Sequence, residues 1–369
     1  MRIVILGGTM KRKKLAAFCL TGALLASVMT GCGINKNATV ASLADGTAVS
    51  MEVANFAMRY QQAATDAMYR SIFGEDVWSQ DLYGNGSTTE ASVKDDVLES
   101  LHEMYTLKSH MSDYGVSLTS EETQAIANAA SAFLAANESA ALKEIGATQN
   151  AVEELLTLYT IQNKMHAAII ADADTNVSDE EANMRAYTML SFSTSGTYDA
   201  DYNYIEPTEE EIAAIEQEAA EVYAEITTPA DLENVAEAHE LNPTSATYAA
   251  DNTSLDEEIK TALDALHEGE MSELITTDSG LYILRLDSET DEEATESNRE
   301  SIIEDRQSAL YDEVLSGWQE NDGWTVKEKQ IAKIQFKNTF TQPEEEDTEA
   351  AEDTESETEA TEETESVEE

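Results

Sequence analysis

The strongest constraint on how this sequence can fold is its excess of acidic side chains. Asp and Glu number 75 against 21 Lys and Arg, which gives a formal net charge of −54. The excess is densest in the last 26 residues, 344–369, where fifteen side chains are acidic and none is basic. Self-repulsion and the lack of apolar residues exclude a packed core there. We therefore predict a disordered acidic tail over 344–369, with the folded part of the chain before it.

The same charge limits the possible partners. Phosphate contacts in nucleic-acid complexes depend on Lys and Arg, so a chain this acidic is not expected to bind nucleic acid. Anionic lipid headgroups repel it as well, so attachment to a membrane has to depend on something other than its surface charge. A simpler role for the charge is solubility outside the cell.

The N-terminus has the layout of a secretory signal. Residues 10–14 form a basic cluster, and residues 15–29 form a mostly apolar run. The run is shorter than the roughly 20 residues that a membrane-spanning helix needs. A basic region followed by a short apolar region is typical of a signal peptide, which we place at residues 1–31.

The residue after this segment is Cys32. Residues 28–32, Val-Met-Thr-Gly-Cys, resemble a bacterial lipobox, in which the Cys receives a diacylglycerol. The resemblance implies lipidation of Cys32 and attachment to the extracytoplasmic face of the cell membrane, with residues 32–39 as a polar tether. The alternative is an ordinary cleaved signal with an incidental Cys. The other Cys, Cys19, lies within the signal, so the mature chain has no disulfide and must rest on its own core.

Residues 40–184 and 290–340 have a mainly helical pattern. Apolar residues recur at the three- to four-residue spacing of core-facing helices in residues 51–70, 92–114 and 151–173. Thr119 and Glu122 fit a capping box at a helix start, and Gly115 is placed to end the helix before it. These features predict a helical domain built from both segments.

The pattern changes between residues 185 and 289. Residues 186–193 are rich in β-forming side chains and predict a strand, and residues 195–205 predict a loop. Helical patterns follow at residues 209–225, 231–239 and 255–266. Residues 274–286 then predict a hairpin. We expect a small α+β domain at 185–289 and, for the whole chain, an α+β, mainly helical fold class.

Several short segments together carry a family resemblance. They are residues 44–52, 115–122, 176–181, 185–190, 262–272 and 277–286. In this order and spacing they resemble the secreted parvulin-type foldases, PrsA-like lipoproteins whose helical part is similar to the SurA chaperone. The resemblance covers most of residues 40–320. It implies a SurA-like helical chaperone domain, a parvulin-like domain at 185–289, and unfolded or newly exported proteins as partners.

The catalytic positions of that family differ here. Where parvulins carry a His in the first strand and another in the last, the aligned residues are Thr188 and Tyr282, and the pocket Met and Phe are replaced by Asp256 and Ile259. Thr188, Ile259 and Tyr282 are therefore the candidate residues of a proline pocket, although Thr188 and Tyr282 also suit ordinary half-buried strand positions. A charge at Asp256 disfavours an apolar pocket. The parvulin-like domain is predicted to be weakly active or inactive, and no catalytic residue is assigned.

Other chemistry has little support. His102 and His110 lie eight residues apart on one predicted helix, and no neighbouring side chain completes a metal-binding pair. The sequence has no phosphate-binding loop, dinucleotide fingerprint or nucleophile elbow. We predict no metal and no cofactor. The sequence does not specify the oligomeric state.

The leading hypothesis is a membrane-anchored extracytoplasmic foldase or chaperone that binds exported, unfolded chains through apolar surface. One alternative is an active peptidyl-prolyl cis-trans isomerase with an atypical pocket. The other is a surface lipoprotein without clients.

Overall fold

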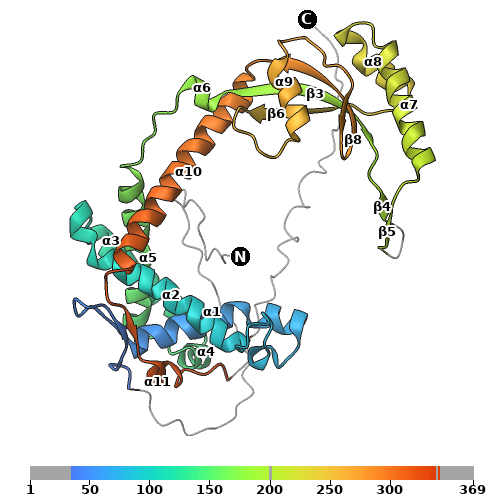
Figure 1. Ribbon diagram of the computed structural model, residues 1–369. Helices are drawn as coiled ribbons and strands as arrows, with labels where there is room; N and C mark the ends of the chain where they lie inside the picture. Colours follow the sequence, from blue (N-terminus) through green and yellow to red (C-terminus); the bar gives the residue numbers. More distant parts are fainter. Residues whose placement is uncertain (1–34, 199–201, 338–339, 341–369) are drawn as a thin grey trace, which may run out of the picture. The chain divides into compact units, whose positions relative to one another are not determined.

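The computed structural model describes residues 35–198, 202–337 and 340. The chain divides into two compact units, whose elements are drawn in Figure 1: unit 1 combines residues up to 168 with residues from 314, and unit 2 contains residues 169–313. Helices predominate and the strands form small sheets, so the predicted α+β, mainly helical fold class is confirmed.

The elements of unit 1 come from both ends of the chain. They are β1 (Thr39–Ser42), β2 (Ala48–Ser50), α1 (Met51–Phe73), η1 (Val77–Ser79), α2 (Thr89–Ser109), η2 (Met111–Tyr114), α3 (Ser120–Ala136), α4 (Ser139–Glu144), most of α5 (Gln149–Ile170), the end of α10 (Glu292–Gln319), β9 (Thr325–Val326) and α11 (Glu328–Ile331).

Unit 2 is continuous in sequence. Its elements are α6 (Asp179–Ala182), β3 (Met184–Ser193), β4 (Thr197–Tyr198), β5 (Tyr204–Ile205), α7 (Glu209–Glu225), η3 (Pro229–Asp231), α8 (Leu232–Ala238), β6 (Thr244–Ala249), α9 (Glu257–Ala265), β7 (Ile275–Thr277), β8 (Gly280–Ser288) and the first part of α10. The unit extends beyond the predicted limits of 185 and 289. Arg299 on α10 donates to Asp179 on α6 at 2.9 Å, which joins the two flanking helices to each other.

Side-chain caps fix the starts of several helices. Ser50 Oγ accepts a hydrogen bond from Val53 N at the start of α1. Thr119 and Glu122 form the reciprocal hydrogen bonds of a capping box at α3. Gly115 follows η2 with a φ of 62°, a left-handed conformation that glycine adopts without steric cost. The capping box at Thr119 and Glu122 and the turn at Gly115, both predicted from the sequence, are confirmed.

The sheet of unit 1 joins the two ends of the described chain. Its strand order is β2–β1–β9, and β1 pairs antiparallel with both neighbours. Val40, Ala41 and Val49 are buried and belong to the same apolar core as α1, α2 and α5. The sequence does not predict β9, because a two-residue strand that pairs with a distant partner has no periodicity of its own.

Buried positive charges hold the segment that follows α11. Arg59 is 2% exposed and donates to the carbonyl of Gln335 at 2.9 Å. Lys94 is 7% exposed and donates to the carbonyl of Ile334. Burial lowers the pKa of Arg59, and its contact with Glu144 opposes that shift. Hydrogen bonds to ionised donors are stronger than neutral ones, so this part of the main chain is firmly fixed in the core.

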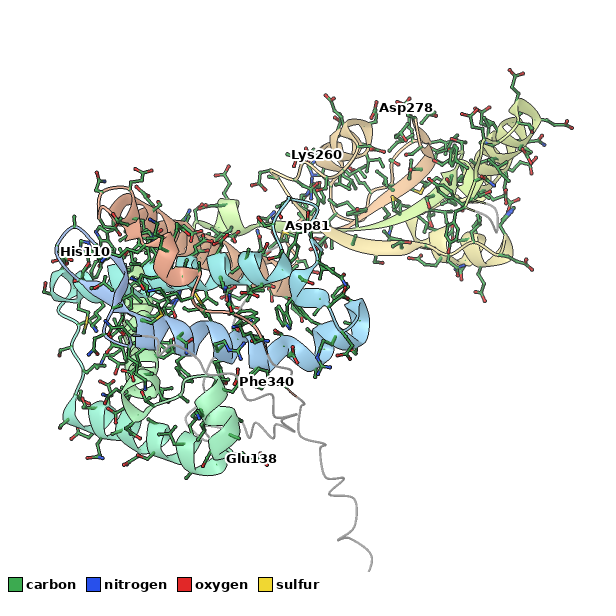
Figure 2. All side chains as sticks on the ribbon, turned by 90° about the horizontal axis from the view of Figure 1, so that it is seen from below. Asp81, His110, Glu138, Lys260, Asp278 and Phe340 are labelled. Carbon is green, nitrogen blue, oxygen red and sulfur yellow. The ribbon has the colours of Figure 1, made fainter. Side chains whose placement is uncertain are left out.

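Asp66 completes the same attachment and has no exposed surface. Its carboxylate accepts hydrogen bonds from Trp78 Nε1 at 2.6 Å, from Phe340 N at 2.6 Å and from Arg70 Nε at 2.9 Å. Phe340, labelled in Figure 2, is itself buried in the core of unit 1. One carboxylate therefore joins α1, η1 and the C-terminal end of the described chain.

The sheet of unit 2 has four antiparallel strands in the order β6–β3–β8–β7. Its two faces carry separate apolar cores. Helices α7 and α8 cover the first face, where Leu190, Phe192 and Ile283 are buried. Helix α9 covers the second face, where Tyr187 and Leu284 are buried.

Two parts of unit 2 differ from the sequence prediction. Strand β6 pairs with β3 along six residues, although the sequence analysis assigned no element there. Residues 195–205, predicted as a loop, contain the short hairpin β4–β5. Both differences have the same physical reason: these strands are mostly exposed, so they lack the alternation of apolar and polar residues that indicates a strand.

Four sequence predictions near the ends of the chain fall wholly or partly outside the described residues. The signal at 1–31, Cys32 and the acidic tail at 344–369 lie outside them. The tether at 32–39 is described from residue 35. There the carbonyl of Lys36 accepts from Glu52 N at 3.0 Å and that of Ala38 accepts from Met51 N at 2.7 Å. This end of the predicted tether is bonded to the start of α1.

We expect Asp66→Ala to lower the free energy of unfolding of unit 1 by about 3–5 kcal/mol, because it leaves buried donors without a partner. Glu75→Ala is the matched control. It removes the 79% exposed partner of the same Arg70, and we expect a loss below about 1 kcal/mol. Urea unfolding followed by tryptophan fluorescence measures both, since all three Trp residues belong to unit 1. Equal losses in the two variants would contradict this account.

Candidate functional site

Thr188 lies in β3, a strand that contributes buried side chains to both faces of the unit 2 sheet. It is 3% exposed. Its hydroxyl bonds to Asp287 Oδ2 at 2.6 Å and to Ser245 Oγ at 3.1 Å. Both partners belong to the adjacent strands β8 and β6. The hydroxyl is therefore engaged within the sheet.

Arg285 is the charged centre of this polar cluster and pairs directly across from Thr188. Its guanidinium donates to Asp287 Oδ1 at 2.6 Å, to Glu233 Oε2 at 2.9 Å and to the carbonyl of Pro229 at 3.1 Å. The hydrogen bond that Arg285 donates to Glu233 raises the pKa of Arg285, and the same bond lowers the pKa of Glu233. The cluster thus joins the sheet to η3 and α8 as a fixed ion network.

Ile259 and Tyr282 belong to the other face. Ile259 on α9 is 4% exposed and buried in the core beneath that helix, and Tyr282 packs at the edge of the same core. The Tyr282 hydroxyl bonds to Ser279 Oγ at 2.8 Å. Ser279 Oγ in turn donates to Asp256 Oδ2 at 3.2 Å. Asp256 is exposed at the N-cap of α9, so its charge borders the apolar core without entering it.

The structure brings two of the three predicted pocket residues together. Successive side chains in a strand point to opposite faces. Thr188 therefore shares the face of Leu190, whereas Tyr282 shares the face of Leu284 and lies beside the core of Ile259. The registers of β3 with β8 pair Thr188 with Arg285 and Tyr282 with Ser191. Thr188 and Tyr282 are consequently separated by the sheet.

Sequence reasoning missed a second polar group on the α9 face. Arg185 donates to the Tyr248 hydroxyl at 2.9 Å and to the carbonyls of Leu263 at 2.9 Å and Leu266 at 2.6 Å. Tyr248 is 1% exposed, and burial raises the pKa of its hydroxyl to about 12. Arg185 thus caps the last carbonyls of α9. An Arg at the start of an apolar strand is the signal that could have indicated this contact.

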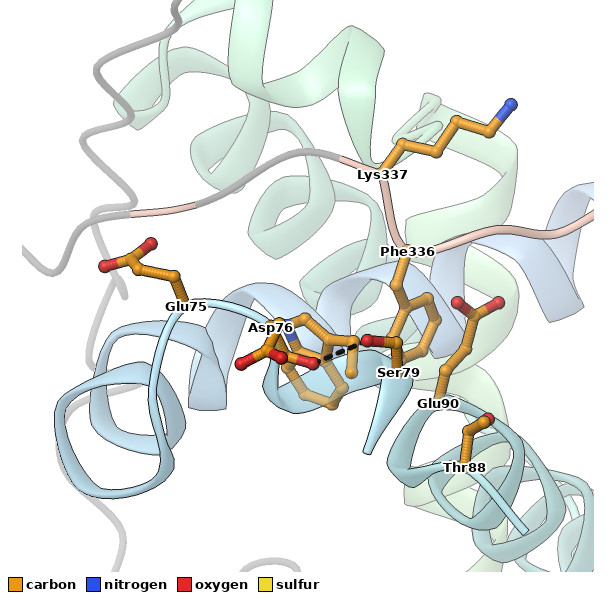
Figure 3. Close-up of a pocket in the computed structure, with 8 residues that line it drawn as sticks. Glu75, Asp76, Ser79, Thr88, Glu90, Phe336 and Lys337 are labelled. Carbon is orange, nitrogen blue, oxygen red and sulfur yellow. Dashed lines mark hydrogen bonds between the residues drawn. The ribbon is translucent and has the colours of Figure 1, made fainter. Parts of the chain in front are cut away.

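Unit 1 contains a pocket of about 320 Å³ beside the segment after α11. Figure 3 shows Glu75, Asp76, Glu90 and Phe336 around it, while the side chain of Lys337 extends away. Trp78 also lines it, with its ring 5.1 Å from that of Phe336. The pocket combines aromatic walls with carboxylates and contains no pairing of a nucleophile with a base.

The described residues contain neither a cluster suited to a metal ion nor a helix suited to span a membrane. Within residues 35–198, 202–337 and 340, no group of three or more His, Cys, Asp or Glu is arranged to hold a metal ion. None of the helices in the described part combines the length and apolarity required to cross a bilayer.

Residues 193–298 match the family model of the PPIC-type PPIase domain. The match confirms the sequence resemblance to a parvulin-type domain, and it falls within unit 2. It begins at Ser193, so Thr188 lies before the matched residues while Ile259 and Tyr282 lie within them. A comparison with curated proteins gave no match.

Several solved structures are similar to the chain. A SurA-like chaperone from Campylobacter jejuni is 12% identical over 79% of this chain and 99% of that one, with a TM-score of 0.31. The foldase PrsA from Streptococcus pneumoniae is 16% identical over 65% of this chain and 91% of that one, with a TM-score of 0.24. The foldase PrsA from Lactococcus lactis is 16% identical over 80% of this chain and 97% of that one, with a TM-score of 0.29.

Proposed function

We propose that this chain is a membrane-anchored extracytoplasmic foldase that binds unfolded or newly exported proteins, with a parvulin-like domain that is weakly active or inactive. The observation that carries the proposal is the match of residues 193–298 to the PPIC-type PPIase domain. Proteins with such a domain handle proline-containing chains, so an unfolded polypeptide is the ligand class that the match favours.

The arrangement of unit 2 supports binding over catalysis. Prolyl isomerisation crosses a barrier of about 18–20 kcal/mol. Catalysis needs an apolar pocket for the ring together with polar groups that favour the twisted amide. Thr188 is buried and bonded to Asp287 and Ser245, and Ile259 is only 4% exposed. With Thr188 and Tyr282 on opposite faces, these residues do not line one open pocket.

Attachment through Cys32 is the second part of the proposal and rests on the sequence alone. A lipobox Cys carries a diacyl group, and two chains give the stable anchoring that one does not. The net charge of −54 disfavours contact with anionic headgroups, which leaves the acyl chains as the attachment.

An active isomerase remains the second candidate because the matched family is a PPIase family. On the α9 face, Tyr282 and Ser279 form a polar pair beside the apolar core of Ile259. A substrate carbonyl could use that pair if the neighbouring core opened.

We expect the purified full chain, in excess, to delay aggregation of a chemically unfolded enzyme, measured by light scattering. Exposed apolar surface on the protein would bind the folding intermediates. A synthetic peptide of residues 344–369 is the control for charge alone and should give no delay. Absence of any delay with the full chain favours the surface lipoprotein without clients and removes the chaperone hypothesis.

In an isomerisation assay with a proline tetrapeptide, we expect the protein to accelerate the uncatalysed reaction by less than about tenfold, far below the roughly 10⁶-fold typical of enzymes. Tyr282→Phe and Thr188→Ala should leave that rate unchanged, with circular dichroism confirming that both variants fold. Fast isomerisation that either substitution abolishes would establish the isomerase alternative.

Replacing Cys32 by Ser should release the protein into the medium or leave its signal unprocessed, because the serine hydroxyl cannot accept the thioether-linked lipid. Cell fractionation measures the change. Cys19→Ser, within the predicted signal, is the matched control and should stay with the membrane. Undiminished membrane attachment of a Cys32→Ser protein whose signal has been cleaved, as its mass would show, would refute the lipid anchor.

A further inference from the structure

Exposed apolar side chains concentrate on one hairpin of unit 2. Among the described residues, eight large apolar or aromatic side chains are exposed, and half of them lie between residues 198 and 205. Their exposed fractions are 69% for Tyr198, 88% for Tyr202, 52% for Tyr204 and 53% for Ile205. We call these four residues the Tyr hairpin. Tyrosine rings give large contact areas at low entropic cost and are enriched at protein interfaces.

The local structure holds the rings of Tyr198 and Tyr204 in place. Strands β4 and β5 pair Tyr198 with Tyr204, whose rings pack edge to face at 5.3 Å. Gly196 N donates to the Tyr204 hydroxyl at 3.0 Å. A Cβ at Gly196 would lie 2.2 Å from the carbonyl oxygen of Ile205, so only glycine permits this close approach. The hairpin is therefore braced by its own contacts while its outer surface stays open.

Tyr202 adds a strained backbone at the point of greatest exposure. Its φ is 62°, and Glu240 is the other non-glycine residue of the described chain with a positive φ. A bulky side chain in this region is a conformational outlier, and such strain persists where the surroundings impose it, often at binding sites. An Asn or Gly at this position would relieve the strain but would remove the ring.

The surroundings of the hairpin are acidic. Between Arg185 and Arg285 the sequence contains a single Lys or Arg, Lys260 on α9 (Figure 2). Glu206, next to β5, and Glu209, at the start of α7, are exposed. A surface of one sign attracts segments of the opposite sign and repels its own. The charge thus selects cationic ligands and disfavours a second copy of this acidic chain.

We propose that the Tyr hairpin is a docking surface for basic, unfolded segments of client polypeptides. Lys and Arg side chains would lay their apolar stems and cationic heads over the Tyr rings while the neighbouring carboxylates pair with their charges. The proposal rests on the proposed function, because it assigns the client chemistry of the foldase. A surface this small gives weak, rapidly exchanging contacts, which suits the holding of an unfolded chain.

The test measures binding of a fluorescein-labelled, unstructured peptide of Lys and Leu to the full chain by fluorescence anisotropy. A peptide with Glu in place of Lys is the second probe. We expect the Lys peptide to bind at least about tenfold more tightly than the Glu peptide, with the difference falling as salt rises. In Tyr198→Ser/Tyr202→Ser, affinity for the Lys peptide should fall about tenfold or more.

Met68→Ser/Ile72→Ser is the matched control, because these α1 side chains are 47% and 63% exposed in unit 1. It should bind the Lys peptide as the unmodified protein does. Equal affinity for both peptides, or an unchanged affinity in the hairpin variant, would overturn the docking proposal. Both results leave the aggregation assay to decide the foldase function separately, provided that the unfolded enzyme is chosen with no excess of Lys.

Discussion

Unit 1 depends on the hydrogen bonds that buried charged side chains of α1 and α2 form with the main chain after α11. Arg59 and Lys94 bond two successive carbonyls of that segment, and Asp66 accepts from the amide of Phe340. Buried charges are costly unless each is paired and hydrogen-bonded, and here the main chain itself supplies the partners. The recognition of main-chain groups fixes the path of the segment, and its apolar side chains then fill the core.

This arrangement explains how unit 2 can be inserted, in sequence, between the two segments that form unit 1. The entropy of closing a loop grows only slowly with its length, so inserting unit 2 adds little to the cost of joining β1 and β9. Within unit 2, the Arg285 network plays the corresponding part by binding Glu233 and Asp287 across the first face of the sheet. In both units a buried or half-buried cationic side chain forms hydrogen bonds that join a helix to a neighbouring part of the chain.

Local signals made much of this fold predictable from the sequence. The capping box of Thr119 and Glu122, the turn at Gly115 and the strand around Leu190 each depend on neighbouring residues, and each is present. Strands β6 and β9 depend instead on partners far along the chain, so their own side chains carry little pattern. The arrangement of the candidate pocket residues was not predictable for a related reason, because only the strand register reveals that Thr188 and Tyr282 occupy opposite faces.

The pairing of β1 with β9 also sets an order for biogenesis. Unit 2 is continuous and has all its strands and helices once residue 313 has been synthesised. Unit 1 lacks its third strand, and its core lacks Ile334 and Phe336, until residues 325–336 have followed. A product truncated before β9 would expose apolar side chains of α1 and α2 to proteases. Completion of unit 1 therefore requires that residues from both ends of the folded region are present.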